Sequence, residues 1–531
     1  MLTCRLSPSS NSPRASGFYR IRGFVNIPLP AKSEAQRSRE IKRYGLYVGG
    51  KWVDAEPGRL IPVVNPYTGE VWAEIAEASA AQVNMAVTAA RRAFDDPGWR
   101  QMKPSWRGRL MWKFGEMLEK NADELARLET MCNGKVIRET RAQMGSFSSW
   151  FYYFGGLADK IQGEVVPVEM EGIFTYTLRE PLGVVAVVAP WNSPLLISVY
   201  SLAPAIAAGN TVVLKPSSFA PVSVLRFASL FEEAGFPPGV VNVVTGSGST
   251  AGDALVGHPV VAKVAFTGGT SSGKSVASRA ADHLVPTTLE LGGKSPNIVF
   301  DDADLAHAVD GIVAGIFSAA GQSCVAGSRA LVQEGVYEDV VSRLVDRTSR
   351  LKLGDPLDEE TEVGPLASKD QLTKVSSYIE LGKKEGVLLW GGGRPESPAL
   401  RRGFFVQPTV FKTDNRSRIA REEVFGPVLS LITFQNEDEA VQIANDTEFG
   451  LAAGIWTRDL GRAHRVARAL QAGTVWINTY RTISYSVPFG GYKQSGYGRE
   501  NGMDAMREFL QTKSVWVQHT GSMRDPFAMR S

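Results

Sequence analysis

The 531-residue sequence predicts an α/β fold with two doubly wound domains and a small additional β element. Four short apolar runs alternate with helical patterns in the first half of the folded chain. They cover residues 184–189, 211–215, 240–245 and 263–267. Each run is almost continuously apolar, as in strands that are buried on both faces of a parallel sheet. A second strand and helix series, over residues 296–478, predicts the other α/β domain.

The composition is that of an ordinary globular protein, with 44% hydrophobic residues, 21% charged residues and a net charge of +3. This charge gives no support to nucleic-acid binding. Three cysteines cannot form a disulfide framework, and the five histidines have no metal-site spacing. Proline and asparagine interrupt the most apolar region, residues 181–214, so we expect no membrane span.

The first forty residues carry Arg, Ser and Pro, with no acidic residue before Glu34. This composition resembles a mitochondrial presequence, and a disordered tail is the alternative. Residues 1–43 are therefore assigned to a tail or targeting segment. The expected location is the cytoplasm, with the mitochondrion as the alternative.

The folded part is expected to begin at Tyr44 with a hairpin over residues 46–52, whose turn is Gly49-Gly50. Amphipathic patterns then predict three long helices. These helices cover approximately residues 80–94, 104–132 and 135–160. Further along, residues 164–170 and 174–178 predict a hairpin that is set apart from both domains, and residues 514–517 predict a last strand.

A glycine-rich turn follows the fourth apolar run and opens a helix. Glycines let the backbone approach a phosphate, and a helix N-terminus favours its charge. Gly268–Ser275 formally matches the P-loop pattern, but no aspartate that could hold a metal ends a nearby strand. We therefore expect a nucleotide site here that is not an ATP or GTP site.

Cys324 lies on a short polar run between an amphipathic segment, residues 303–320, and a strand-like segment, residues 328–332. Cysteine is a strong nucleophile near neutral pH with only modest help, so a thiol on such a loop is a catalytic candidate. A small buried side chain without chemistry is the alternative.

Seven motifs in order resemble those of the aldehyde dehydrogenase superfamily, from Tyr44 to Val517. They are Pro190-Trp191-Asn192, Lys215-Pro216-Ser217, Phe266-Thr267-Gly268, Leu289-Glu290-Leu291-Gly292-Gly293-Lys294, Gly321-Gln322-Ser323-Cys324, Glu422-Glu423-Val424-Phe425-Gly426-Pro427 and Pro488-Phe489-Gly490-Gly491. Each motif is a weak signal, whereas all seven in order are specific.

The resemblance implies NAD(P)-dependent oxidation of an aldehyde to a carboxylic acid. Cys324 would add to the carbonyl and form a thiohemiacetal, whose oxyanion would be held by the Asn192 amide and the Cys324 backbone N–H. Hydride loss would leave a thioester, and Glu290 would activate the water that hydrolyses it.

The cofactor contacts that the resemblance implies begin with Lys215 and Glu423, which would bind the adenosine ribose and the nicotinamide ribose. The other residues that would shape this cleft are Trp191, Gly246, Gly268 and Phe425. Two positions depart from the family pattern. Ser218 stands where a glutamate often repels a 2′-phosphate, so NAD is expected and NADP remains possible. Gly269 stands where the family often has serine.

The resemblance also places a substrate tunnel after Asn192 and on the loop before Pro488. Its expected residues are Ser193, Ile197, Tyr200, Arg481, Ile483 and Phe489, which make the tunnel less aromatic than in many relatives. Arg481 is interpreted first as a solvated surface residue. Glu500 is expected on a proton path, although Ser201 replaces the lysine that the family often uses there.

The predicted division gives residues 44–161 and 182–292 to an NAD(P)-binding domain and residues 293–492 to a catalytic domain. Residues 162–181 and 493–521 would form an oligomerisation element, so a homodimer or homotetramer is expected. Two other functions stay open: a CoA-acylating aldehyde dehydrogenase, which Glu290 disfavours, and a non-catalytic protein on the same fold. No metal is expected.

Overall fold

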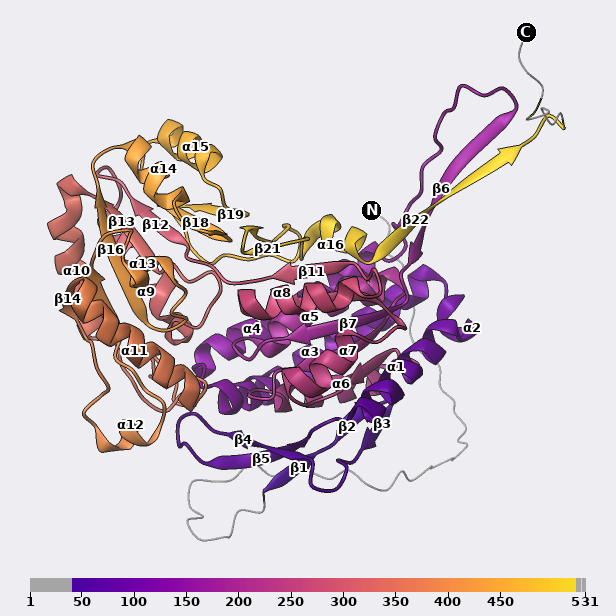
Figure 1. The fold of residues 1–531 in the computed structure, drawn as a ribbon, viewed down its shortest axis with the longest axis horizontal. Coiled ribbons are helices and arrows are strands. Elements are labelled where there is room, and N and C mark those ends of the chain that lie inside the picture. The colour runs from indigo at the N-terminus through magenta and orange to yellow at the C-terminus, as the bar shows by residue number, and fades with distance from the viewer. Residues whose placement is uncertain (1–40, 522–526, 528–531) are drawn as a thin grey trace, which may run out of the picture. The chain divides into compact units, whose positions relative to one another are not determined.

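The computed structural model describes residues 41–521 and residue 527, which belong to one compact unit. It has the α/β architecture that the sequence predicts, with two large and mostly parallel sheets (Figure 1). The first sheet has the order β21 (Gly496–Tyr497), β11 (Thr287–Glu290), β10 (Val261–Thr267), β7 (Val184–Ala189), β8 (Thr211–Pro216), β9 (Val241–Val243), β2 (Leu46–Val48) and β3 (Lys51–Val53). The second has the order β14 (Val387–Trp390), β15 (Thr409–Lys412), β16 (Val428–Phe434), β13 (Arg329–Gln333), β12 (Pro296–Val299), β18 (Ala452–Trp456) and β19 (Thr474–Ile477).

Strand β7 shows why the apolar runs of the first sheet are continuous. Val184 and Ala186 pack on one face, and Val185 and Val187 pack on the other. The first face is covered by α1 (Ala80–Asp95), α7 (Asp253–Val256) and α8 (Thr270–Ala281). The second is covered by α3 (Pro104–Asn133), α4 (Ile137–Leu157), α5 (Pro194–Ala208) and α6 (Val222–Ala234). Each valine buried in this way contributes about 1.5–3 kcal/mol.

The second sheet is covered on both faces in the same manner. Val299 and Ala330 pack against α9 (Leu305–Phe317) and α10 (Tyr337–Ser349). Ile298 and Leu331 pack against α14 (Glu437–Asn445) and α15 (Leu460–Ala469). The remaining α-helices are α2 (Pro97–Arg100), α11 (Lys369–Glu385), α12 (Pro398–Arg402), α13 (Arg418–Arg421) and α16 (Gly502–Glu508).

Smaller β elements begin and end the described chain. A three-stranded sheet has the order β1 (Lys42–Tyr44), β5 (Val71–Ala76) and β4 (Leu60–Val64), so the first strand begins two residues before the expected Tyr44. The predicted hairpin is present as β2 and β3, with Gly49 and Gly50 at positive φ in its turn. A short pair joins β17 (Phe449–Gly450) to β20 (Tyr492–Lys493).

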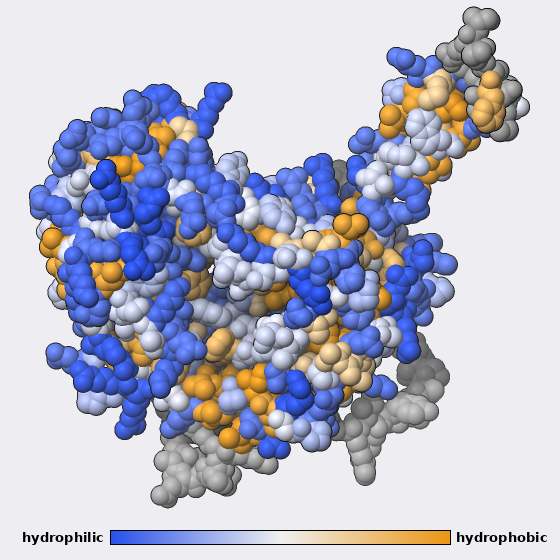
Figure 2. Space-filling model, in the orientation of Figure 1, coloured by the Kyte–Doolittle hydropathy of each residue, from blue (hydrophilic) through white to orange (hydrophobic). Residues whose placement is uncertain are grey.

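The predicted hairpin near residue 170 differs in the structure. Strand β6 (Ile173–Pro181) pairs along its whole length with β22 (Leu510–Gln518), and the two form a ribbon that extends from the rest of this unit (Figure 1). Residues 164–170 form no strand and make only one bridge, between Val165 and Tyr176. The ribbon exposes apolar side chains, as Figure 2 shows. They include Phe174, Leu178, Trp516 and Val517.

The expected tail or targeting segment lies outside the described residues up to residue 40. Of the helices in the described ranges, none combines the length and the apolar character needed to cross a membrane.

Candidate active site

The loop that carries Cys324 is held in a strained conformation between α9 and β13. The chain leaves α9 through Ala319 and Ala320, both at φ 52°, and through Gly321 at φ 73°. A residue other than glycine held there costs roughly 1–3 kcal/mol. A Cβ at Gly321 would lie 2.1 Å from the carbonyl oxygen of Gly426, so only glycine fits. The surrounding structure therefore imposes this loop conformation.

Gln322 fastens the loop and connects it to Asn192. Its Oε1 accepts the backbone N–H of Ala367 at 2.9 Å, and its backbone carbonyl accepts Nδ2 of Asn192 at 2.9 Å. Asn192 is buried. The Asn192 amide, which is predicted to bind the oxyanion, thus contacts the loop that carries the predicted nucleophile.

The Cys324 thiol faces two cavities and is therefore only partly exposed. Enclosure by protein atoms raises the pKa of the thiol to about 12, and the carboxyl groups of Glu290, Glu423 and Glu500 add to this shift. In the protein alone, a thiol with this pKa is protonated at neutral pH. A positive charge placed beside it would lower this pKa.

Glu290 ends β11, where the strand pairs with Gly496 of β21. Both oxygens of its carboxyl group are buried and have no hydrogen-bond partner among the described residues. Burial, and then the nearby Glu500, raise the pKa of Glu290 well above its usual range. A buried carboxyl group without partners is rare in a purely structural role, so this position suits a proton acceptor.

Glu500 is the second buried carboxyl group of this site. Its Oε1 accepts the hydroxyl of Ser201 at 3.3 Å, and its backbone exchanges two hydrogen bonds with Phe489. Burial raises the pKa of Glu500 to about 8. Glu290 and Glu500 influence each other, so their protons dissociate as a pair.

The first of the two cavities has a volume of about 650 Å³. It is lined by Pro190, Trp191, Asn192, Ile197, Thr267, Gly268, Gly269, Leu291, Gly292, Cys324, Gln371, Lys374, Glu423 and Phe425. Most of the predicted cofactor residues are in this set, whereas Lys215, Ser218 and Gly246 are not. Sequence reasoning missed Gln371 and Lys374, because α11 carries no motif.

Glu423 and Phe425 are fixed by backbone contacts on either side of this cavity. Oε1 of Glu423 accepts the N–H of Gly293 at 3.1 Å, and a Cβ at Gly292 would lie 2.4 Å from Oε2. Phe425 is held at φ 57°, and its carbonyl accepts Nε2 of Gln371 at 2.6 Å. The ring of Phe425 meets the Trp191 ring edge to face, with centroids 5.3 Å apart. These contacts hold Glu423, Phe425 and Trp191 in place in the lining of the cavity.

Lys215 is the penultimate residue of β8 and does not line this cavity. Its buried Nζ donates to the carbonyl of Pro216 at 3.0 Å, and among the described residues no carboxylate pairs with it. Burial lowers the pKa of Lys215 to about 8. A buried ammonium group with one carbonyl partner has donors left for a ligand, so this position fits the ribose of a dinucleotide.

Gly246 and Ser218 lie on the segments around Lys215. Gly246 has φ 144° and precedes a π-helix, Gly248–Gly252, and a Cβ at Gly252 would lie 3.6 Å from Cε of Lys215. Ser218 follows β8 in a turn and is partly exposed. Their roles as cofactor contacts stay predictions.

The second cavity has a volume of about 1000 Å³ and is also lined by Cys324. Its lining residues are Ala142, Gln143, Ser146, Trp150, Asn192, Ser193, Leu196, Ile197, Tyr200, Thr267, Glu290, Ser323, Cys324, Val325, Arg481, Ile483, Phe489 and Glu500. All six predicted tunnel residues lie in this set. Trp150, on α4, stacks on Tyr200 with centroids 5.4 Å apart, and this ring was not predicted.

Arg481 lines this cavity and is only partly exposed. It has φ 62°, which is uncommon for a side chain of this size. Its Nη1 donates to the carbonyl of Ala314 at 3.2 Å, and among the described residues no carboxylate pairs with it. This placement differs from the freely solvated surface arginine that the sequence favoured.

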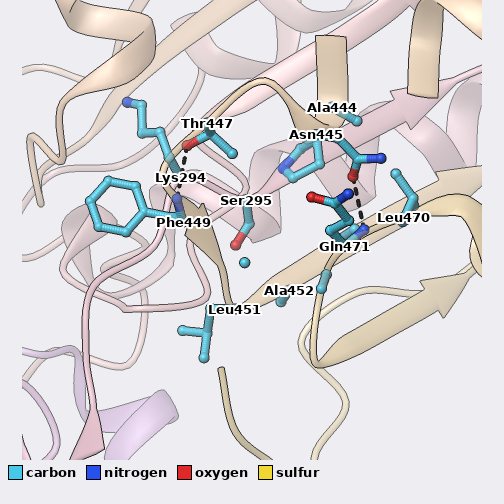
Figure 3. A pocket seen from close by; sticks show the side chains of 14 residues that line it. Lys294, Ser295, Ala444, Asn445, Thr447, Phe449, Leu451, Ala452, Leu470 and Gln471 are labelled. Carbon is cyan, nitrogen blue, oxygen red and sulfur yellow. Dashed lines mark hydrogen bonds between the residues drawn. The ribbon is translucent and has the colours of Figure 1, made fainter. Parts of the chain in front are cut away.

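A smaller cavity of about 250 Å³ lies elsewhere, beside Ser295 and Leu451 (Figure 3). Its polar groups bond to one another: Asn445 Oδ1 accepts the N–H of Gln471, and Thr447 Oγ1 accepts the N–H of Phe449. None of the predicted site residues lines it. In the described ranges, no three His, Cys, Asp or Glu side chains are grouped so as to hold a metal ion.

Comparison with known proteins identifies the family. A sequence model of the aldehyde dehydrogenase family matches residues 52–515. A betaine aldehyde dehydrogenase of Mesorhizobium japonicum is 47% identical over 91% of this chain and 98% of its own length. A (Z)-2-((N-methylformamido)methylene)-5-hydroxybutyrolactone dehydrogenase of Acinetobacter baylyi is 45% identical over 92% of this chain and 100% of its own length.

Solved structures give the same result at the level of the fold. The crystal structure of a betaine aldehyde dehydrogenase of Staphylococcus aureus in complex with NAD⁺ superposes with a TM-score of 0.90. It is 40% identical to this chain, and the match covers 92% of this chain and 97% of that chain. The predicted fold class is thereby confirmed, and the chain belongs to the aldehyde dehydrogenase family.

Proposed function

We propose that this protein oxidises an aldehyde to a carboxylic acid with NAD as the electron acceptor. The observation that carries the proposal is the position of Cys324, where two separate cavities meet beside Asn192. One cavity has the residues and the size for the nicotinamide end of the cofactor. The other has room for an aldehyde.

The first step forms a bond between Cys324 Sγ and the aldehyde carbon as the thiol gives its proton to solvent water. The carbonyl oxygen becomes an oxyanion, which the Asn192 amide and the Cys324 backbone N–H stabilise. One such donor is worth about 2.7–4 kcal/mol. One N–H of the Asn192 amide donates to the carbonyl of Gln322 at 2.9 Å, which holds the amide in place and leaves its second N–H for the oxyanion.

When bound, NAD supplies the acceptor for the hydride that leaves the thiohemiacetal carbon, and a thioester remains on Cys324. Lys215 and Glu423 would hold its two riboses, and Trp191, Gly268 and Phe425 would enclose the nicotinamide end. Ser218 carries no negative charge, so the 2′-phosphate of NADP would not be repelled there.

The last step is hydrolysis of the thioester. Ionised Glu290 accepts a proton from water as the water oxygen attacks the acyl carbon. The C–S bond then breaks, which releases the carboxylic acid and leaves Cys324 as a thiolate. Glu500 would take the proton onward from Glu290, because both carboxyl groups line the second cavity.

The test is Cys324→Ala, with Cys132→Ala as the matched control. Cys132 is the other free cysteine of the described chain and is buried in the core around α3. We expect Cys324→Ala to abolish NADH production with any aldehyde while the NAD dissociation constant stays within about threefold. Cys132→Ala should keep its turnover. Substantial turnover in Cys324→Ala would place the nucleophile elsewhere.

We also propose that the ribbon of β6 and β22 pairs subunits in a homo-oligomer. It exposes large apolar side chains on a two-stranded sheet, and such a sheet is only marginally stable without further packing. A second copy of the chain would cover these side chains.

A further inference from the structure

The turn that follows α3 contacts the segment from Trp191 to Leu195 through polar side chains. Asn133 Nδ2 donates to the carbonyl oxygens of Trp191 and Asn192, at 3.2 Å in both cases. Two residues further on, Lys135 Nζ donates to Ser193 Oγ at 2.5 Å. The same ammonium group donates to Oε1 of Gln143 at 3.1 Å.

At the start of α5, the hydrogen bond from Lys135 to Ser193 takes the place of the usual N-cap hydrogen bond. Ser193 is the N-cap residue of α5, yet its side chain makes no capping hydrogen bond. A serine at this position usually accepts an N–H of the first helical turn. Here the N–H of Leu195 is instead accepted by Oε2 of Glu129, at 3.3 Å. A carboxyl group from another helix thus caps α5, and the Ser193 hydroxyl is free to accept from Lys135.

Burial of these charged and polar side chains costs free energy of folding. The exposed fractions are 0% for Glu129, 2% for Asn133 and 5% for Lys135. Burial lowers the pKa of Lys135, while the neighbouring Glu129 and Glu139 oppose that shift. Burial raises the pKa of Glu129 to about 7, and its Oε1 has no hydrogen-bond partner among the described residues. Apolar side chains of similar volume would fill this space at a lower cost in free energy. We therefore look for a functional role of these polar groups.

We propose that Asn133 and Lys135 are positioning residues that hold the Asn192 amide against the Cys324 loop. Asn133 holds the backbone carbonyls of Trp191 and Asn192, and Lys135 holds the side chain of the next residue, Ser193. The Asn192 side chain donates to the carbonyl of Gln322 at 2.9 Å. This inference rests on the proposed function, because it takes Asn192 as the oxyanion donor. A small displacement of a catalytic group can cost about 100-fold in rate, so a clamp on this segment matters for turnover.

The experiment is a double-mutant cycle with the full-length enzyme. Lys135→Met and Asn133→Ala are each made in the wild-type and in the Asn192→Ala background. In the wild-type background each should lower kcat about 10- to 100-fold, with aldehyde KM and the NAD dissociation constant changed by less than about threefold. In the Asn192→Ala background the same changes should lower kcat by less than about threefold, because the group they position is gone.

Thr140→Val is the matched control. The Thr140 hydroxyl forms a hydrogen bond with the Thr130 hydroxyl at 2.9 Å, between α4 and α3, and another with the carbonyl of Ile137. Both bonds lie outside the Trp191–Leu195 segment. It should lower the melting temperature and leave kcat within about twofold in both backgrounds. Asn133→Ala keeps both charged groups, so it provides the cycle even where Lys135→Met does not fold.

Equal losses of kcat in the two backgrounds would overturn the inference, because Asn133 and Lys135 would then act independently of Asn192. An Asn192→Ala variant with unchanged kcat would overturn the role assigned to Asn192 in the proposed function, and this inference with it. The two failures are therefore distinguishable.

Discussion

Three carboxyl groups surround the Cys324 thiol, and each of them opposes its ionisation. Glu290, Glu423 and Glu500 all contribute to the raised pKa of Cys324, after the larger effect of burial. A raised thiol pKa disfavours the thiolate, which is the reactive form of cysteine. At the scale of single residues, the site is controlled by protonation as much as by geometry.

Glu290→Gln separates the two halves of the reaction. The amide keeps the size of the carboxyl group and removes the base that accepts the proton of water. We expect steady-state kcat to fall about 10²- to 10⁴-fold, the usual contribution of general base catalysis. Rapid mixing should still show a burst of NADH close to one equivalent per site. Loss of the burst together with turnover would mean that acylation also depends on Glu290.

Arg481→Met tests whether the guanidinium in the second cavity selects the substrate. The Arg481 guanidinium, which has no carboxylate partner among the described residues, can form two parallel hydrogen bonds to one carboxylate group. An ω-carboxylated aldehyde should therefore bind more tightly than a plain one. We expect KM for this aldehyde to rise about tenfold, which corresponds to about 1.4 kcal/mol, while KM for a plain aldehyde of equal length stays the same.

Arg468→Met, on α15, is the control for Arg481→Met, because Arg468 is exposed and lines neither cavity at Cys324. Equal changes of KM for both aldehydes would mean that Arg481 holds the loop through Ala314 and does not contact substrate.

Sequence motifs led to the residues around Cys324 but not to those that support them. Asn192, Glu290 and Glu423 belong to short local patterns, and the structure brings all three to the cavities at Cys324. Lys135 has no such pattern, because its partner Ser193 lies 58 positions away in the chain. Contacts of this kind become visible only when the fold places the two segments together.

At the scale of elements, the differences from prediction arise at segment ends and in strand pairing. In the amphipathic segment of residues 303–320, helix α9 ends at Phe317, because Ala319 and Ala320 adopt left-handed backbone that their residue type does not signal. Residues 164–170 have a strand-like pattern, but β6 pairs with β22 instead. That pairing joins segments about 330 positions apart, which local periodicity cannot indicate.

Trp516→Glu tests the ribbon as a subunit contact. A charge in the covered apolar surface would be desolvated without a partner, which costs several kcal/mol. We expect size-exclusion chromatography with light scattering to show a smaller species than the wild type. Trp106→Glu, at another exposed tryptophan on α3, is the matched control and should leave the mass unchanged. An unchanged mass for Trp516→Glu would argue against this interface.

At the scale of the whole molecule, buried carboxyl groups connect stability to pH. Burial raises the pKa of Glu500 to about 8, whereas a glutamate in an unfolded chain has a pKa of about 4.3. Between these values the folded state binds more protons than the unfolded state. The stabilisation is fully present below about pH 4.3 and is lost as the pH rises through about 8.

Glu500→Gln should therefore reduce the loss of stability at alkaline pH. We expect the fall in melting temperature between about pH 6 and about pH 9 to be smaller by roughly 2 °C or more. Differential scanning calorimetry would measure it, with the exposed Glu396→Gln as the control. The same slope in both variants would mean that Glu500 titrates near its ordinary pKa.

The arrangement of two covered parallel sheets was the most predictable property of the molecule. Val184–Ala189 is apolar along its whole length and Thr211–Pro216 along most of it, because both faces of β7 and β8 are buried, and that pattern is visible in the sequence. The order of the strands and the place of β21 beside β11 depend on long-range pairing, which the sequence did not reveal.

The meeting of two cavities at one sulfur atom has a consequence for inhibitor design. Under the proposed function, a thiol-reactive compound that enters through the 650 Å³ cavity would displace the dinucleotide, whereas one that enters through the 1000 Å³ cavity would compete with the aldehyde. Trp150, Arg481 and Ile483 line the second cavity and not the first. A covalent probe shaped to these side chains would report on this protein in the presence of saturating cofactor.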